Sequence, residues 1–130
     1  MARITGRIEV LLDGVKLLNK SGASASGIGI SGEQNYELTS VQGDSGHHGY
    51  IEKPVMARCE VTITDRDDIL LSNLAKIRET GTVIFQAAGG GKVYTMGMAT
   101  CLRNFTITGG EGETPIIFEG PYWIETTSPT

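Results

Sequence analysis

The chain has 130 residues, of which 39% are hydrophobic, 20% are charged and 18 are glycine. A chain of this length can bury a core without disulfides or metal ions, so we expect a single domain over residues 1–130. The net charge of −4 and the absence of any lysine or arginine run argue against a basic surface of the kind that grips nucleic acid. The glycine content, about twice the usual share of about 7%, favours tight turns over long helices.

The N-terminal segment has the pattern of a β-hairpin. Apolar and polar side chains alternate over residues 3–12, with Ile8, Val10 and Leu12 on one side. This period of two is typical of a strand with one buried face. Asp13-Gly14 follows, which is a strong hairpin signal, and residues 15–18 are expected to form the returning strand.

Two segments rich in glycine and serine come next, near residues 20–35 and 42–50. We expect both to be flexible loops, because long connections in compact domains are usually functional or disordered. Residues 36–41 between them have the pattern of a short strand.

The clearest strand begins at Pro54, since Val55, Cys59, Val61 and Ile63 point to one side. A helix is expected after Asp65 or Asp67, either of which could cap its first turn. Its apolar stripe and its C-terminal stop are predicted from Leu70, Leu71, Leu74, Ile77 and Gly81.

Strands are expected over residues 82–88 and 92–98, joined by a turn at Gly89-Gly90-Gly91, and again over 101–108 and 115–125. Residues 126–130 are expected to form a loose tail. The fold class that follows is mostly β: a sandwich or barrel of about seven or eight strands with one flanking α-helix.

Tests for a catalytic or ligand-binding motif give no candidate. Gly89-Gly90-Gly91-Lys92 is followed by Val93 and a strand, whereas a phosphate-binding loop leads into a helix. His47 and His48 are adjacent and would point to opposite sides of an extended segment, which does not suit chelation of one metal ion. We therefore expect a protein without enzymatic activity, cofactor or metal.

Cys59 and Cys101 have no metal-binding or redox spacing. The favoured interpretation is that both are small residues buried in the core. A disulfide between them is the alternative that the sequence leaves open.

The whole chain from about residue 2 to 125 resembles the tail tube proteins of contractile-tailed phages of the Mu type. The resemblance is carried by an overall pattern of non-catalytic motifs. These are residues 6–10 (GRIEV) with Asp13-Gly14, 27–32 (GIGISG), 49–55 (GYIEKPV), 59–68 (CEVTITDRDD), 81–85 (GTVIF), 89–94 (GGGKVY), 112–115 (GETP) and 118–121 (FEGP).

The resemblance implies a tail-tube-like subunit that forms rings of six, and these rings stack into the inner tube of the tail. DNA would cross the lumen without specific binding, and the partners would be the tail sheath, tape-measure, baseplate and tail-terminator proteins. Such a subunit would be assembled in the host cytoplasm, become part of the virion and have no membrane partner.

Contacts between subunits or rings are expected to come from the two glycine-rich segments. The candidate assembly residues are Ser21, Gly22, Ser24, Gly27, Ile28, Ile30, Asp44, His47, His48 and Tyr50. Two other interpretations remain open: a tube subunit of a type VI-like secretion or tailocin apparatus, and a small ligand-binding β-barrel.

Overall fold

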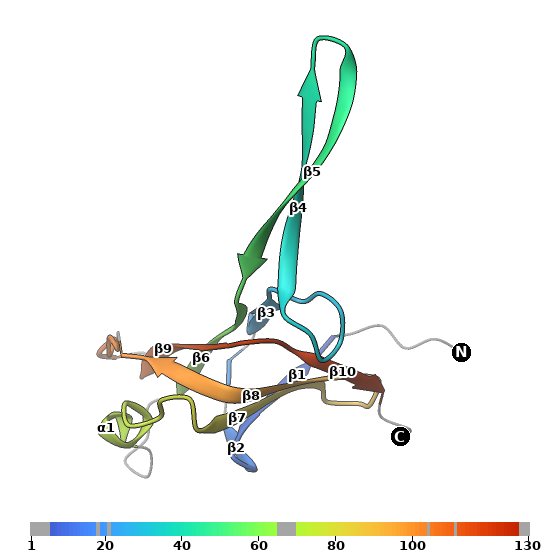
Figure 1. The fold of residues 1–130 in the computed structure, drawn as a ribbon. Coiled ribbons are helices and arrows are strands. Elements are labelled where there is room, and N and C mark those ends of the chain that lie inside the picture. The colour runs from blue at the N-terminus through green and yellow to red at the C-terminus, as the bar shows by residue number, and fades with distance from the viewer. Residues whose placement is uncertain are drawn as a thin grey trace.

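The computed structural model describes residues 6–17, 19–20, 22–64, 70–103, 105–110 and 112–127. Within these ranges it has ten strands and one short helix, arranged as a compact body and a projecting arm (Figure 1). The elements are β1 (Ile8–Leu12), β2 (Val15–Leu17), β3 (Ser24–Ser26), β4 (Asn35–Gly43), β5 (Gly46–Val55), β6 (Ala57–Thr64), α1 (Leu71–Leu74), β7 (Gly81–Ala87), β8 (Lys92–Leu102), β9 (Glu113–Gly120) and β10 (Ile124–Thr127). The predicted mostly-β class with one helix is confirmed.

The body is one open antiparallel sheet with the strand order β2-β1-β7-β8-β9-β6-β3, and β10 pairs with β8 beside this path. We call β2, β1, β7, β10 and the first part of β8 the β1 half. The end of β8 with β9, β6 and β3 is the β6 half. The sheet does not close on itself, so of the two predicted architectures the barrel is wrong for the isolated chain.

Strand β8 joins the two halves because it pairs with β10 over residues 92–95 and with β7 over residues 93–99, and then with β9 over residues 100–102. The pairing of β7 with β8 shifts register between Gly81 and Val83, and Met98 has a positive φ of 53°. The sequence pattern predicts two strands, at 92–98 and 101–108, whereas the structure has one strand that runs to Leu102 with an irregularity in its middle.

One hydrophobic core receives side chains from both halves. Alternate residues of β1 and β6 point into it, as the period-two patterns predicted. The core residues with the largest fully buried side chains are Phe118, Ile63, Met96, Ile116, Val10 and Val83.

The first hairpin forms as predicted at Asp13-Gly14, where both residues have positive φ. Its turn is also fixed to β7, because the Asp13 amide donates to the Thr82 carbonyl at 2.8 Å and the Thr82 amide donates to Asp13 Oδ1 at 2.9 Å. At the other end of the chain, β10 continues to Thr127. The loose tail predicted from residue 126 is therefore wrong for residues 126 and 127, and residues 128–130 lie outside the described ranges.

Of the two predicted flexible loops, residues 42–50 are almost entirely strand, whereas residues 20–35 contain only a short strand and the first residue of β4. Residues 42–50 belong to the β4–β5 hairpin, whose turn is only Asp44-Ser45. Residues 20–35 include β3, which pairs with β6 through Ser24, Ala25 and Ser26. The predicted short strand at 36–41 is therefore one side of a much longer ribbon.

The helix is shorter than predicted, because only residues 71–74 are α-helical. Its N-cap is Leu70, which makes no side-chain capping bond, so capping by an aspartate is wrong; Asp65 and Asp67 themselves lie outside the described residues. Leu74 is buried and Ile77 packs against the core, whereas Leu70 is 57% exposed.

Replacing Leu74 with alanine is expected to lower the free energy of unfolding by about 2–5 kcal/mol, because a buried side chain is lost and a cavity is left. Leu70→Ala removes the same atoms from an exposed site and is expected to change stability by less than about 0.5 kcal/mol. Chemical denaturation of both variants measures the difference. Equal effects would contradict the packing of α1.

Candidate assembly surface

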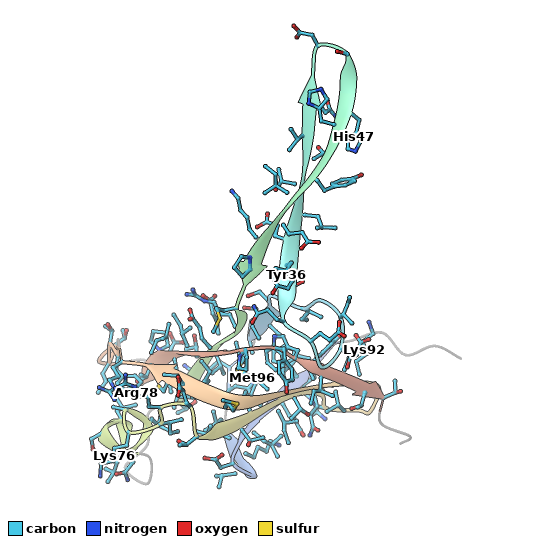
Figure 2. All side chains as sticks on the ribbon, in the orientation of Figure 1. Tyr36, His47, Lys76, Arg78, Lys92 and Met96 are labelled. Carbon is cyan, nitrogen blue, oxygen red and sulfur yellow. The ribbon has the colours of Figure 1, made fainter. Side chains whose placement is uncertain are left out.

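The β4–β5 arm stands away from the body (Figure 1), and side chains project from both of its faces (Figure 2). In an antiparallel ribbon, residues that pair directly point to the same face. One face therefore carries the pairs Tyr36–Pro54, Leu38–Glu52 and Ser40–Tyr50, and the other carries Glu37–Lys53 and Thr39–Ile51.

Both faces of the arm expose large apolar side chains to solvent (Figure 2). Tyr50 is 66% exposed, Leu38 60%, Tyr36 50% and Ile51 49%. Tyrosine is enriched in protein interfaces and is frequent among the residues that dominate binding energy. An exposed apolar surface of this kind suits contact with another protein.

The arm has support from its own chain only near its root. Among the described residues, β4 and β5 make extensive contacts with each other and with no other strand or helix. At the root, the Gln34 side chain donates to the Val55 carbonyl at 3.2 Å. The preceding segment is held to the body, since the Gly32 amide donates to the Trp123 carbonyl at 3.0 Å and the Glu125 amide donates to Ser31 Oγ at 2.8 Å.

An open hollow of about 520 Å³ lies at this root. It is lined mainly by apolar surface, and its walls include Ile30, Gln34, Tyr36, Leu38 and Glu52. Two carboxylates, Glu33 and Glu52, also line it, and among the described residues its lining contains no histidine, cysteine, lysine, serine or threonine. A mainly apolar hollow of this kind suits the side chain of another protein.

The structure brings four of the predicted assembly residues onto the arm: Asp44, His47, His48 and Tyr50. The rings of His47 and Tyr50 meet edge to face, with centroids 4.9 Å apart. Ile28 and Ile30 lie in the exposed segment that leads into the arm, at 40% and 70% exposure.

The remaining predicted residues are elsewhere. Ser24 lies in β3 of the body, Gly22 is in an exposed turn, and Ser21 lies outside the described residues. Gly27 has φ of +74°, and a Cβ atom there would collide with the Met56 carbonyl oxygen. Its glycine is thus required by local packing, whether or not it also contacts a partner.

Sequence reasoning missed Tyr36, Leu38 and Ile51 as exposed arm residues. One feature of the sequence could have indicated them: strand-like segments lie on both sides of Gly43-Asp44-Ser45-Gly46, and this arrangement fits a hairpin as well as a loop.

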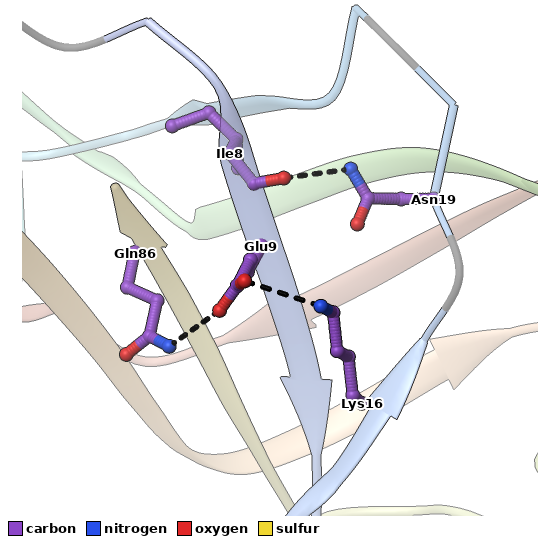
Figure 3. Close-up of polar contacts among 5 residues, drawn as sticks. All are labelled: Ile8, Glu9, Lys16, Asn19 and Gln86. Carbon is purple, nitrogen blue, oxygen red and sulfur yellow. Dashed lines mark hydrogen bonds and ion pairs between the residues drawn. The ribbon is translucent and has the colours of Figure 1, made fainter. Parts of the chain in front are cut away.

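The outer face of the β1 half mixes apolar and polar side chains, and its charged groups lie in a small cluster around Glu9. Glu9 accepts hydrogen bonds from Lys16 Nζ at 3.1 Å and from Gln86 Nε2 at 3.2 Å (Figure 3). These contacts, Lys16 foremost, hold the pKa of the Glu9 carboxyl below its usual value. The same face also presents Leu11, Ile84, Val93, Thr95 and Ile124.

The outer face of the β6 half is more polar. It carries two cations, Arg58 and Lys20, and both are ion-paired. Their carboxylate partners are Glu60, Glu119 and Glu113, so these five groups give the face one net negative charge. Most of its neutral positions carry hydroxyls, at Ser24, Ser26, Thr62, Thr64 and Thr100.

Neither cysteine has a partner for redox or metal chemistry. Cys59 and Cys101 both pair with Phe118, from opposite sides of β9. They are thus two strand spacings apart, about 10 Å, which is beyond the reach of a disulfide. No group of three or more metal-ligating side chains occurs in the described part of the chain, and no helix there could span a membrane.

Burial raises the pKa of the Cys59 thiol to about 12 and that of Cys101 to about 11. At pH 8 both are therefore protonated, and we expect the folded protein not to react with Ellman's reagent, whereas the unfolded chain releases two equivalents. Val15→Cys, at a site that is 67% exposed, should add one rapidly reacting thiol. Rapid reaction of the unaltered folded protein would contradict this packing.

Comparison with known proteins places the chain among tube-forming proteins. A family model described as phage tail tube protein matches residues 1–125. A comparison with curated protein sequences found no match.

Three solved structures share the fold at low sequence identity. The anti-feeding prophage cap, a tube-terminating cap, is 11% identical, covers 94% of this chain and 89% of its own, and has a TM-score of 0.61. The sheath/tube terminator of the PVC extracellular contractile injection system is 13% identical, with 92% and 93% coverage and a TM-score of 0.60. The PVC sheath–tube complex is 11% identical, with 98% and 92% coverage and a TM-score of 0.61. The match of the family model over nearly the entire chain shows that this protein belongs to the phage tail tube protein family, whose members are structural and not enzymatic.

Proposed function

We propose that this protein is the repeating subunit of the inner tube of a contractile phage tail of the Mu type. Six copies form a ring, rings stack into a hollow tube, and the tube is part of the virion after assembly in the host cytoplasm. The tail sheath surrounds it, the tape-measure protein lies within it during assembly, and baseplate and tail-terminator proteins meet its two ends. DNA passes through the lumen during ejection.

The observation that carries this proposal is the arm. It exposes Tyr36, Leu38, Tyr50 and Ile51 on two faces and has little support from its own chain. A contact in which one copy inserts its arm against a different surface of the next copy is heterologous, and heterologous contacts generate rings or filaments. This is the kind of contact that a stacked tube requires.

The lumen is lined by the outer face of the β6 half. A passage for DNA must stay wet and must not bind phosphate groups, which a surface of hydroxyls with a net negative charge satisfies. The outer face of the β1 half has the partly exposed side chains of Leu11, Ile84 and Val93 and the exposed side chain of Ile124, and apolar groups in these positions suit contact with protein. It therefore faces outward, toward a neighbouring subunit or the sheath.

A second candidate function is a ring that ends the tube, or a tube of a phage-like injection particle. It is favoured by the similarity to the cap and terminator structures, which have TM-scores as high as that of the sheath–tube complex. The two roles differ in what the purified protein does alone. A tube subunit grows into long tubes, whereas a terminator stops at single rings.

Replacing Tyr50 with lysine places a charge on the arm without disturbing the body, because that side chain is 66% exposed in the free subunit. We expect a folded subunit whose critical concentration for tube formation rises at least about tenfold, which corresponds to about 1.4 kcal/mol per contact. Negative-stain microscopy and sedimentation measure this.

The matched control is Val15→Lys, at a site that is 67% exposed on the β1–β2 hairpin. It is expected to assemble like the unaltered protein. Normal tube growth by the Tyr50 variant would show that the arm is not the assembly element.

A further inference from the structure

Arg58 lies in the middle of the outer face of the β6 half. An unpaired cation at this position would be well placed to bind phosphate groups. Its neighbours across the sheet are Ser26 on β3 and Glu119 on β9. Glu60 follows two residues later on the same strand and therefore points to the same face.

Each nitrogen of the Arg58 guanidinium is close to a carboxylate oxygen. Nη2 lies 2.9 Å from Glu60 Oε1, and Nε donates to the same oxygen at 3.1 Å. Nη1 lies 3.6 Å from Glu119 Oε1 on the opposite side. The Nε–Nη2 side of the guanidinium, one of the forks with which arginine binds a phosphate, is thus occupied by Glu60. Glu119 adds a second negative charge beside Nη1 without a hydrogen bond.

The contribution of this cluster to stability is small, because its side chains are 29–51% exposed and exposed ion pairs are typically worth about 0–1 kcal/mol. Its main effect is electrostatic. Two carboxylates within a few ångströms of one guanidinium leave a net negative site, at a distance well below the screening length of about 8–10 Å in physiological salt. A DNA phosphate approaching Arg58 therefore meets repulsion from two carboxylates, and one donor fork of the guanidinium is already occupied by Glu60.

We propose that Glu60 and Glu119 mask Arg58, and that this masking keeps the face from binding the phosphate backbone. The proposal rests on the proposed function in one respect, namely that this face lines the passage for DNA. The masking itself is a property of the single subunit. The partner that the unmasked site would bind is a phosphate group of nucleic acid.

The test compares four forms of the protein: the unaltered chain, the double variant Glu60→Gln/Glu119→Gln, the triple variant that adds Arg58→Ala, and the control Glu33→Gln/Glu125→Gln. The control also removes two negative charges, but from positions outside the Arg58 cluster: the Glu125 carboxylate accepts from Tyr94, and neither carboxylate is ion-paired with a lysine or arginine within the described residues. Each form is assembled, checked for tubes by microscopy, and incubated with a short fluorescent single-stranded oligonucleotide over a range of salt concentrations.

We expect the Glu60/Glu119 variant to bind the oligonucleotide at least about tenfold more tightly than the unaltered tubes at low salt, with an affinity that falls steeply as salt rises. The triple variant and the control are expected to behave like the unaltered tubes. The masking proposal is overturned if the double variant gains no affinity, if the gain survives Arg58→Ala, or if the control gains as much.

A measurement on the free subunit separates this proposal from the tube assignment. The Nε–H resonance of Arg58 is followed by NMR during titration with inorganic pyrophosphate. A shift that saturates in the Glu60/Glu119 variant but not in the unaltered subunit supports masking, whether or not tubes form. A failure of the unaltered protein to form tubes would overturn the proposed function and leave the masking proposal standing. Equal shifts in both forms would overturn masking whatever the assembly state.

Discussion

The arm places the strongest constraint on this structure, because a two-stranded ribbon is marginally stable by itself in water. Ordering each backbone residue costs roughly 1–2 kcal/mol of conformational entropy, and residues 35–55 recover little of this from the body. Their cross-strand pairs are exposed on both faces, apart from the partial burial near the root and at Val41 and Gly49. Contact with another molecule can supply the missing stabilisation, and the exposed apolar side chains are placed to make it.

The body meets the opposite requirement, since it must be stable before it assembles. Strand β8 makes this possible by pairing in both halves of the sheet, so that one core collects buried residues from both. The irregularity at Met98 lies where β8 passes from one set of partners to the other. With the inner faces filled in this way, the two outer faces are free to differ. One combines apolar side chains with the Glu9 cluster, and the other is rich in hydroxyls around Arg58.

The body could be predicted from the sequence wherever one face of a strand is buried. Val10 and Leu12, and likewise Cys59, Val61 and Ile63, alternate with polar residues because the core lies on one side of them. The Asp13-Gly14 turn was predictable because its positive φ angles favour those residue types.

The arm was not predictable in the same way, because neither of its faces is buried within the subunit and no alternation marks it. Leu38 and Ile51 point to opposite faces and are both exposed. The helix was overestimated for a related reason: the stripe from Leu70 to Ile77 is apolar, yet the chain turns after Leu74 and leaves Leu70 in solvent. Four of the ten candidate assembly residues do lie on the arm. The glycines of residues 43–49 predict a surface segment there, although they favour a loop and the segment is a hairpin.

Hydrogen exchange of backbone amides tests most directly whether the arm depends on assembly. In the free subunit, amides of β4 and β5 are predicted to exchange orders of magnitude faster than those of β6, which lies in the core sheet. In assembled particles the same arm amides are predicted to become protected to a degree comparable with β6. Arm amides that are as protected as β6 in the free subunit, or that stay unprotected in assembled tubes, would contradict the account.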